Sequence, residues 1–229
     1  KIKHPEINES KCTHCGRCSE MCQFNALAVI GNETIFYPEL CHGCGLCSLV
    51  CPEGAIEEVD HEIGIVEYGR AREFEFIQGE LTVGDPLAPP IISELKKYIN
   101  SEGVSILDSP PGTACPAVEA IHDSDFAILV TEPTPFGLND LKLTVDICRE
   151  MEIPFGVIIN RDGIGNEGVE EYCRREGIPI LMSIPDSRKI AELYAEGKPF
   201  VDEIEGWKDQ FIELKQSIER ELGRRIPKV

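Results

Sequence analysis

The sequence has few basic residues for its length. Its 229 residues include 22 Lys and Arg against 41 Asp and Glu, which gives a formal net charge of −19. Nucleic acids and anionic membrane surfaces are bound through clustered Lys and Arg, so a chain this acidic disfavours both as partners. We therefore expect no nucleic-acid partner, and any bound phosphate must be held by local contacts.

Long apolar runs are also missing. No stretch approaches eighteen uninterrupted apolar residues, the length typical of a helix that crosses a bilayer. No basic start followed by an apolar run marks a signal peptide. These absences predict a cytoplasmic protein without stable membrane insertion. Because the sequence starts at Lys1 and not at Met, we also expect a segment of the natural protein upstream of it.

Cysteine, by contrast, is abundant, with eleven residues of which eight fall in two tight runs within the first 51 positions. Such clustered spacing is typical of metal binding and not of a disulfide framework. The other three, Cys115, Cys148 and Cys173, are scattered. Scattered cysteines in a reducing cytosol usually pack as small apolar residues, so we expect no ligand role for them.

The two runs have identical spacing and lie 29 residues apart, with Pro52 directly after the second. Three thiolates separated by two residues each can surround one cubic cluster from a single loop, whereas a fourth thiolate three residues further on points toward a second cluster. The spacing therefore predicts two interlocked four-iron four-sulfur clusters. The predicted ligands are Cys12, Cys15, Cys18 and Cys51 for the first cluster, and Cys41, Cys44, Cys47 and Cys22 for the second.

Zinc is the alternative metal, since paired Cys-x-x-Cys units also form tetrahedral four-thiolate sites. A complete run of four repeated in register favours iron-sulfur clusters instead. Residues 5–62 resemble the bacterial two-cluster ferredoxins, although Gln23 stands where that family has a proline after the fourth cysteine. We expect residues 1–62 to form a two-cluster ferredoxin domain that handles electrons at low potential.

After residue 62, apolar runs alternate with amphipathic segments, which indicates an α/β fold with a mostly parallel sheet flanked by helices. Continuous apolar runs bounded by Gly, Pro or Asp predict buried parallel strands over residues 104–107, 126–130, 155–159 and 178–184. The segments between them predict helices over 116–122, 137–151, 168–176, 187–196 and 204–222. Shorter strands over 63–68 and 72–83 are expected before a helix near 88–100.

The carboxyl ends of the expected strands carry residues suited to a nucleotide. Ligands of such sheets bind beyond these ends. Asp108 ends the first expected strand and can hold magnesium directly or through water, and the N–H of Gly112 can approach a phosphate. The third and fourth expected strands lead into Asn160, Arg161, Pro185 and Asp186.

In order and spacing these strand ends resemble the MinD and Mrp branch of P-loop ATPases with a deviant Walker A motif, and more narrowly its subgroup with an inserted ferredoxin domain. The resemblance implies an ATPase domain over residues 63–229, with ATP and magnesium as ligands and a homodimeric assembly. It implies that Asp108 is the Walker B acid and that Gly112 contacts the terminal phosphate. It places the remaining residues at the base, with Asn160 on the adenine edge and Arg161, Pro185 and Asp186 nearby.

The family's glycine-rich phosphate loop, whose N–H groups and Lys hold the phosphates, does not occur in this sequence. The only Gly-Lys pair, Gly197-Lys198, lacks the preceding glycine and is followed by Pro199. The strand before that loop is central in such sheets, so without it apolar strands would keep unpaired edges. We expect the loop upstream of Lys1, and we expect ATP hydrolysis only when it is present.

Two further patterns have ordinary structural explanations. Gly163, Gly165 and Gly168 match the spacing of a dinucleotide-binding fingerprint, but they follow a late strand of the domain and not its first. Residues 204–222 place apolar side chains on one helical face. Their mixed charges favour packing on the protein's own sheet over docking to a membrane.

Two functional hypotheses follow. The leading one is an ATPase that couples nucleotide-driven conformational change to electron transfer through its clusters, or to assembly of a metal cluster on a partner. The alternative is a non-enzymatic electron carrier whose α/β domain is a docking scaffold. Either requires a redox or cluster-assembly protein partner, and the acidic surface suits a partner with a basic patch.

Overall fold

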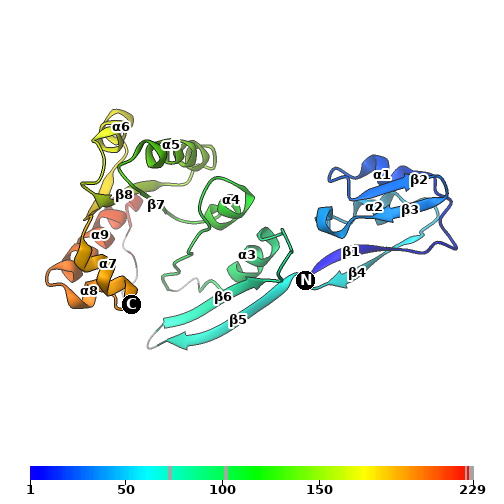
Figure 1. Cartoon of the computed structure of the whole chain (residues 1–229), viewed down its shortest axis with the longest axis horizontal. Helices are drawn as coiled ribbons and strands as arrows, with labels where there is room; N and C mark the ends of the chain where they lie inside the picture. Colours follow the sequence, from blue (N-terminus) through cyan, green and yellow to red (C-terminus); the bar gives the residue numbers. More distant parts are fainter. Residues whose placement is uncertain (72–73, 101–102, 225, 227–229) are drawn as a thin grey trace. The chain divides into compact units, whose positions relative to one another are not determined.

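The computed structural model describes residues 1–71, 74–100, 103–224 and 226. Residues 72 and 73, at the start of one expected strand, lie outside the described residues. The chain divides into two compact units, Lys1–Ile99 and Asn100–Val229 (Figure 1). The first unit contains both cysteine runs. The domain boundary expected between residues 62 and 63 stays a prediction.

The cysteine-rich part of the first unit is built from short elements. Its four strands form two antiparallel pairs, β1 (Ile2–Ile7) with β4 (Ile56–His61) and β2 (Leu27–Ile30) with β3 (Glu33–Phe36). The first pair joins the two ends of this part, because Ile2 is opposite His61 and Ile7 is opposite Ile56. A single 3-10 turn, η1 (Pro38–Leu40), leads from β3 toward the second cysteine run.

The two cysteine runs follow the same local course. Each passes through a left-handed glycine, Gly16 at φ 80° or Gly45 at φ 74°, and then enters a short helix, α1 (Arg17–Met21) or α2 (Leu46–Val50). A side chain with a Cβ atom is strained at such φ values, so glycine permits the tight turn into each helix. The sequence repeat is thus also a structural repeat.

The rest of the first unit is an antiparallel hairpin of β5 (Gly64–Ala71) and β6 (Phe74–Leu81), followed by α3 (Pro89–Lys96). Ile91 of α3 is buried against the hairpin, where a Cβ atom added at Gly79 would lie 2.3 Å from its Cγ2. The glycine therefore allows the helix to approach the strand closely. These elements match the strands and the helix expected in this region.

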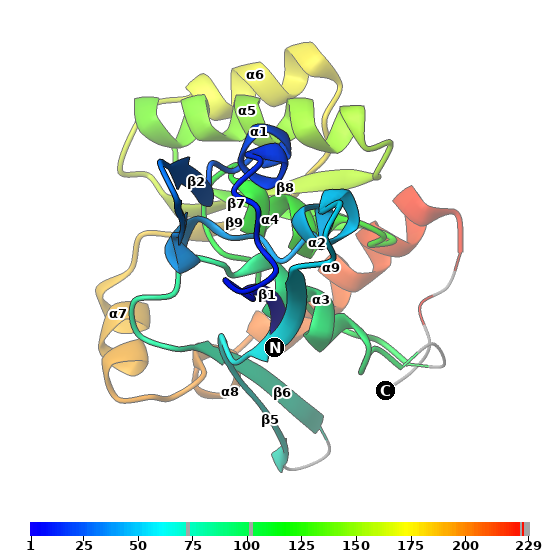
Figure 2. The same cartoon turned by 90° about the vertical axis from the view of Figure 1, so that its right-hand side faces the viewer.

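The second unit confirms the predicted α/β fold class. Its sheet has the order β7-β8-β9 with all strands parallel, formed by β7 (Ala127–Thr131), β8 (Phe155–Asp162) and β9 (Ile180–Pro185). Helices cover both faces (Figure 2). One face carries α5 (Pro135–Glu150) and α6 (Gly168–Glu176), and the other carries α7 (Arg188–Ala195), α8 (Phe200–Glu203) and α9 (Trp207–Leu222).

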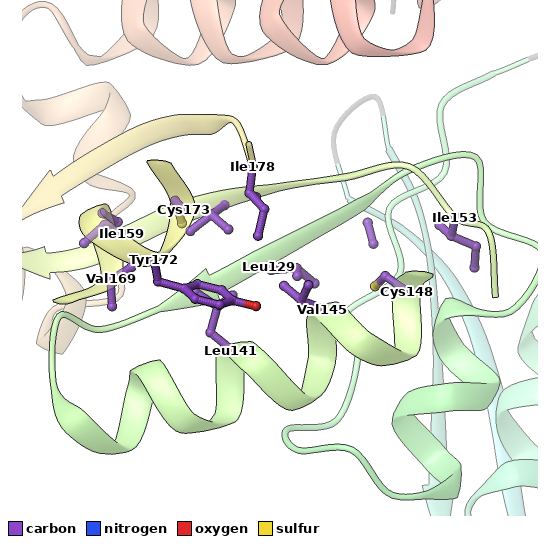
Figure 3. Close-up of a cluster of buried hydrophobic side chains, with 12 residues drawn as sticks. Leu129, Leu141, Val145, Cys148, Ile153, Ile159, Val169, Tyr172, Cys173 and Ile178 are labelled. Carbon is purple, nitrogen blue, oxygen red and sulfur yellow. The ribbon is translucent and has the colours of Figure 1, made fainter. Parts of the chain in front are cut away.

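The larger apolar core lies between the sheet and helices α5 and α6 (Figure 3). Leu141, Val145 and Cys148 recur along α5 at helical spacing and point toward the strands. Cys148 and Cys173 are both completely buried, and burial raises the pKa of Cys148 and raises that of Cys173 to about 11. These two cysteines pack as apolar residues, as expected. Cys115, in contrast, is exposed.

The C-terminal helix α9 packs on the sheet, as its mixed charges predict. Its buried Trp207 and Leu214 contact Ile158 and Met182 on the face opposite α5. The helix begins after Gly206, which has a left-handed φ of 88°. In the part of the chain that the structure describes, no helix combines the length and the apolar character needed to cross a membrane.

The prediction of a first parallel strand over residues 104–107 is wrong. Residues 104–107 are irregular in the structure, and Ile106 is 91% exposed. A strand persists only where its N–H and C=O groups pair with a neighbouring strand, and among the described residues none lies beside this segment. The apolar pattern of this segment is strand-like, but pairing with a neighbouring strand decides whether a strand forms. The helix expected after it is present as α4 (Cys115–Ile121).

Candidate metal centres

The repeated loop and helix place the eight clustered cysteines in equivalent positions. Cys18 and Cys47 lie within α1 and α2, and Cys22 and Cys51 are the residues that end these helices. The first two cysteines of each run lie in the loop before the helix. A fourth cysteine at the far end of a helix is carried away from the other three, which is the geometry that the spacing predicts.

The eight clustered cysteines line two pockets. The first pocket is lined by Cys12, Cys15, Cys18 and Cys51, and the second pocket by Cys22, Cys41, Cys44 and Cys47. Each pocket therefore takes three cysteines from one run and the fourth from the other. The structure brings together the two sets of four that the sequence predicts to share a cluster.

The donors fit an iron-sulfur cluster chemically. Soft thiolates are the ligands of such clusters, and their sulfurs accept hydrogen bonds from backbone N–H groups. Here the N–H of Ala26 donates to Cys22 Sγ and that of Ala55 donates to Cys51 Sγ, both at 3.3 Å. The cysteines around each pocket are spaced more widely than the ligands of a single metal ion. In the described ranges, no three His, Cys, Asp or Glu side chains lie close enough together to hold one ion.

Burial opposes ionisation of several of these thiols before metal binds. It raises the pKa of Cys18 and Cys41 and raises that of Cys47 to about 11, because a thiolate loses hydration inside the protein. Only the thiolate is a metal ligand, and a coordinating thiol is deprotonated outright. Assembly of clusters in these pockets therefore releases protons.

Different side chains surround the two pockets. In the first, the Thr34 hydroxyl lies 3.5 Å from Cys12 Sγ, and His14 Nδ1 lies 3.7 Å from the same sulfur and 3.2 Å from Thr34 Oγ1. In the second, Glu58 lines the pocket and accepts a hydrogen bond of 2.5 Å from Ser48 Oγ. Neither Thr34 nor Glu58 belongs to the predicted site residues.

A second candidate site lies at the carboxyl edge of the parallel sheet, where Arg161 links the ends of three strands. Its Nε is 3.2 Å from Asp186 Oδ1, just after β9, and its Nη1 is 3.5 Å from Glu132 Oε1, just after β7. The pKa of Arg161 is raised, chiefly by the hydrogen bond to Asp186 and then by the charge of Glu132. The backbone adds a bond from Asp186 N–H to the Asp162 carbonyl at 2.9 Å.

The residues predicted to surround the adenine base therefore share one edge of the sheet. Asn160, half-buried, and Arg161 belong to the end of β8, while Pro185 ends β9 and Asp186 follows it. The structure brings Arg161 and Asp186 into contact and adds Glu132, which the sequence reasoning missed. The nucleotide role of these residues stays a prediction.

Asp108 and Gly112, predicted to contact magnesium and the terminal phosphate, lie in the irregular segment before α4. Both are exposed, and Gly112 has a left-handed φ of 88°. Asp108 thus does not end a strand of the described sheet, because the expected strand before it has not formed. Their roles at magnesium and phosphate stay predictions.

Gly165 has a structural reason of its own. A Cβ atom at this position would lie 1.5 Å from the Pro133 carbonyl oxygen, so any other residue would displace the chain. The N–H of Asn166 donates to the same carbonyl at 3.1 Å. Close backbone packing therefore explains this glycine, in agreement with the structural interpretation of the fingerprint-like pattern.

Fold and pockets together define a protein with a two-cluster ferredoxin-type part and a parallel α/β unit. Residues 5–58 match the family described as the 4Fe-4S dicluster domain. The uncharacterized protein MJ0578 of Methanocaldococcus jannaschii is 35% identical over 213 residues, which is 86% of this chain and 75% of that protein. MJ0579 of the same organism is 29% identical over 217 residues, 90% of this chain and 75% of that protein.

A more distant relative connects the chain to the P-loop ATPases. The iron-sulfur cluster carrier protein of Aquifex aeolicus is 32% identical over 111 residues, which is 42% of this chain and 30% of that protein. The chain belongs to the family of MJ0578, carries a 4Fe-4S dicluster domain, and is similar over part of its length to the Mrp-type iron-sulfur cluster carriers, which are P-loop ATPases. The resemblance stated from the sequence is therefore confirmed.

Proposed function

We propose that the protein is an iron-sulfur ATPase that couples ATP binding and hydrolysis to electron transfer, or to metal-cluster assembly on a partner protein. The observation that carries this proposal is the presence, in one chain, of two four-cysteine pockets and a parallel sheet with a charged network at its carboxyl edge. Nucleotides bind at that edge in open α/β sheets.

In this proposal Asp108 holds magnesium and Gly112 contacts the terminal phosphate. Asn160 reads the adenine edge, with Arg161, Pro185 and Asp186 beside the base. The ion pairs of Arg161 support this arrangement, because they fix the ends of β8 and β9 against each other. The phosphates themselves require the glycine-rich loop, which this sequence does not contain.

Electron transfer is the preferred output of the two clusters. Each pocket draws ligands from both cysteine runs, so releasing one cluster would also loosen the other half of the domain. Interlocked ligands of this kind suit fixed redox centres better than clusters that are transferred to another protein. The partner would then be a redox or cluster-assembly protein with a basic patch, met in the cytoplasm by a homodimer of the ATPase.

The test compares this chain with a version extended by a glycine-rich phosphate-loop segment, both purified anaerobically with their clusters. We expect ATP binding and turnover from the extended protein alone, and we expect Asp108→Asn in the extended protein to abolish turnover. Nucleotide should also change the rate at which the reduced clusters pass electrons to an acceptor protein. Absence of ATP binding in both proteins would refute the ATPase proposal.

A second function is favoured by one observation. Residues 104–107, which precede the predicted magnesium ligand, are not part of the described sheet. A non-enzymatic electron carrier with a docking α/β unit needs no ordered magnesium ligand there. In that case electron transfer would proceed at the same rate with and without nucleotide, in the extended protein as well.

A further inference from the structure

The 29-residue repeat allows the two cluster pockets to be compared position by position. The backbone hydrogen bonds to the fourth cysteine of each run follow the repeat, because the bond from Ala26 to Cys22 and the bond from Ala55 to Cys51 have the same length of 3.3 Å. Peptide groups therefore affect the two clusters alike at this position. One backbone bond breaks the repeat, since the N–H of Gly43 donates to Cys41 Sγ at 3.5 Å in the second pocket. The Thr34 hydroxyl lies at the same distance of 3.5 Å from Cys12 Sγ in the first pocket and offsets this bond, so the order of the two clusters depends on the side chains that break the repeat.

One such break is a polar pair beside the first pocket. Thr34 reaches from β3 to within 3.5 Å of Cys12 Sγ, and His14 Nδ1 contacts both that sulfur and the Thr34 hydroxyl. An iron-bound thiolate carries no proton, so in the loaded protein the Thr34 hydroxyl is the donor. The positions 29 residues later are Gly43 and Ile63, neither of which has a side chain that can donate.

The second break is a carboxylate beside the second pocket. Glu58 of β4 is half-buried and lines that pocket together with its four cysteines. It lies close to the ligand loop, since a Cβ atom at Gly45 would be 2.5 Å from Glu58 Oε1, and Ser48 Oγ donates to the same oxygen. The position 29 residues earlier is Val29, which is apolar.

The other charged residues do not cancel this difference. Lys3 also lines the second pocket, but its Nζ is 2.6 Å from Asp60 Oδ1 and its side chain is half exposed. The first pocket is lined by Arg17 and Glu53, which are both exposed and have opposite charges. Exposed charges are screened by solvent and salt far more than a half-buried carboxylate is.

Reduction adds one negative charge to a cluster. A hydroxyl that donates to a ligand sulfur stabilises that charge, whereas a nearby carboxylate opposes it. We propose that the two clusters are unequal, with the first cluster as the electron acceptor of the pair and the second as the stronger reductant. Thr34 and Glu58 determine this order. One electron leaves the second cluster, which is oxidised, and reduces the first, with no other reactant.

This inference rests on the two clusters of the proposed function and not on ATP. It is tested on the full chain with both clusters loaded anaerobically, by potentiometric titration followed by electron paramagnetic resonance. Two midpoint potentials are expected. Thr34→Val should lower the upper one only, and Glu58→Gln should raise the lower one only. Each should change the distribution of the electron between clusters about tenfold, equivalent to about 59 mV for one electron.

Matched variants separate these effects from general perturbation. Thr34→Ser keeps a hydroxyl and should restore the upper potential. Glu57→Gln removes the same charge from the neighbouring, exposed position of β4 and should leave both potentials in place. If Thr34→Val moves the lower midpoint, or if Glu57→Gln acts as strongly as Glu58→Gln, the proposal is overturned.

Iron content distinguishes a failure of this inference from a failure of the proposed function. Protein that carries two clusters but has equal potentials, insensitive to Thr34 and Glu58, overturns this inference and leaves the proposed function intact. Protein that cannot hold two clusters overturns the proposed function as well. If Thr34→Val alone fails to load, the Glu58→Gln and Glu57→Gln titrations still decide the order of the potentials.

Discussion

Residues 1–62 and the parallel α/β unit differ in what holds them together. The α/β unit has two apolar clusters, one on each face of its sheet, and six of the seven largest fully buried side chains belong to it. Among the described residues of 1–62 no side chain reaches that burial. The buried apolar side chains of this region are few, and they include Ala26, Leu27 and Ile56.

The difference indicates two sources of stability. A chain segment of about 60 residues buries little apolar surface, and many small natural domains add metals or disulfides to a core of that size. Here the buried apolar core is small and two four-cysteine pockets lie beside it, so we expect metal binding and folding to be coupled in this part. The α/β unit buries Val145, Val157 and Ile159 completely, so we expect it to fold without the clusters.

The largest predicted effect comes from removing the clusters. Treatment with an iron chelator and reductant should unfold residues 1–62 and leave the α/β unit folded, because only the first region uses metal in place of a core. Amide hydrogen exchange measures this, with loss of protection in β1–β4 and retained protection in β7–β9. Protected amides in β1–β4 of iron-free protein would show that this region has a sufficient core of its own.

The second prediction concerns a substitution that destabilises the α/β unit and leaves residues 1–62 unchanged. Leu141→Ala removes a buried side chain from α5 and should lower the free energy of unfolding of the α/β unit by about 2–5 kcal/mol. Trp207, the only tryptophan, lies in that unit and reports its unfolding by fluorescence, while visible absorbance reports the clusters.

The control for this variant is Leu143→Ala on the same helix, where the side chain is 48% exposed and little burial is lost. Its cost should be well below that of Leu141→Ala. Cluster absorbance should be the same in both variants. A loss of clusters in Leu141→Ala would mean that the stability of the two regions is not separable.

The sequence was most informative where contacts are local. The cysteine spacing predicted which four residues share each pocket, because three ligands of a pocket lie in one loop and short helix and the fourth occupies the repeated position at the end of the other helix. Period and turn residues likewise located α5, α6 and the three parallel strands. Apart from the fourth ligand of each pocket, which the repeat itself indicates, these features depend on residues only a few positions apart.

The sequence did not predict features that depend on contacts between residues far apart in the chain. Residues 104–107 have a strand-like composition, yet a strand forms only beside another strand. Thr34 and Cys12 are 22 residues apart in the sequence, and Arg161 and Glu132 are 29 apart. No local sequence pattern therefore predicts either contact. Aligning the two halves of the repeat would have singled out Thr34, because Ile63 stands at the equivalent position.

A third prediction compares two cysteines whose pKa burial raises to about 11, Cys47 and Cys173. Cys173 is a neutral thiol in the folded α/β unit, with a pKa above its ordinary value of 9.0. As pH rises from about 9 to 11 the unfolded chain loses this proton first, so the unit should lose stability, by up to about 2–3 kcal/mol. Cys47 as an iron ligand is already a thiolate and contributes no such slope.

The measurement is the denaturant midpoint of Trp207 fluorescence at several alkaline pH values. Cys173→Ala should lower the midpoint at neutral pH and reduce its fall between pH 9 and 11, which loss of packing alone would not do. A variant with an unchanged slope would assign the alkaline sensitivity to other groups, such as the buried Tyr172, whose pKa burial also raises.

The smallest predicted effect concerns the N-terminus of α5, which lies next to the carboxyl edge of the sheet. Thr134 is the N-cap, and its Oγ1 accepts a hydrogen bond of 3.0 Å from the Gly137 N–H. Thr134→Ala should therefore lower the stability of the α/β unit by about 1 kcal/mol and leave cluster absorbance unchanged. Thr134→Ser, which keeps the oxygen, should recover most of the loss, whereas Thr144→Ala, at a half-buried position in the interior of the same helix, removes no cap and should change stability by no more than about 0.5 kcal/mol. Equal effects of Thr134→Ala and Thr144→Ala would mean that the cap does not stabilise this edge.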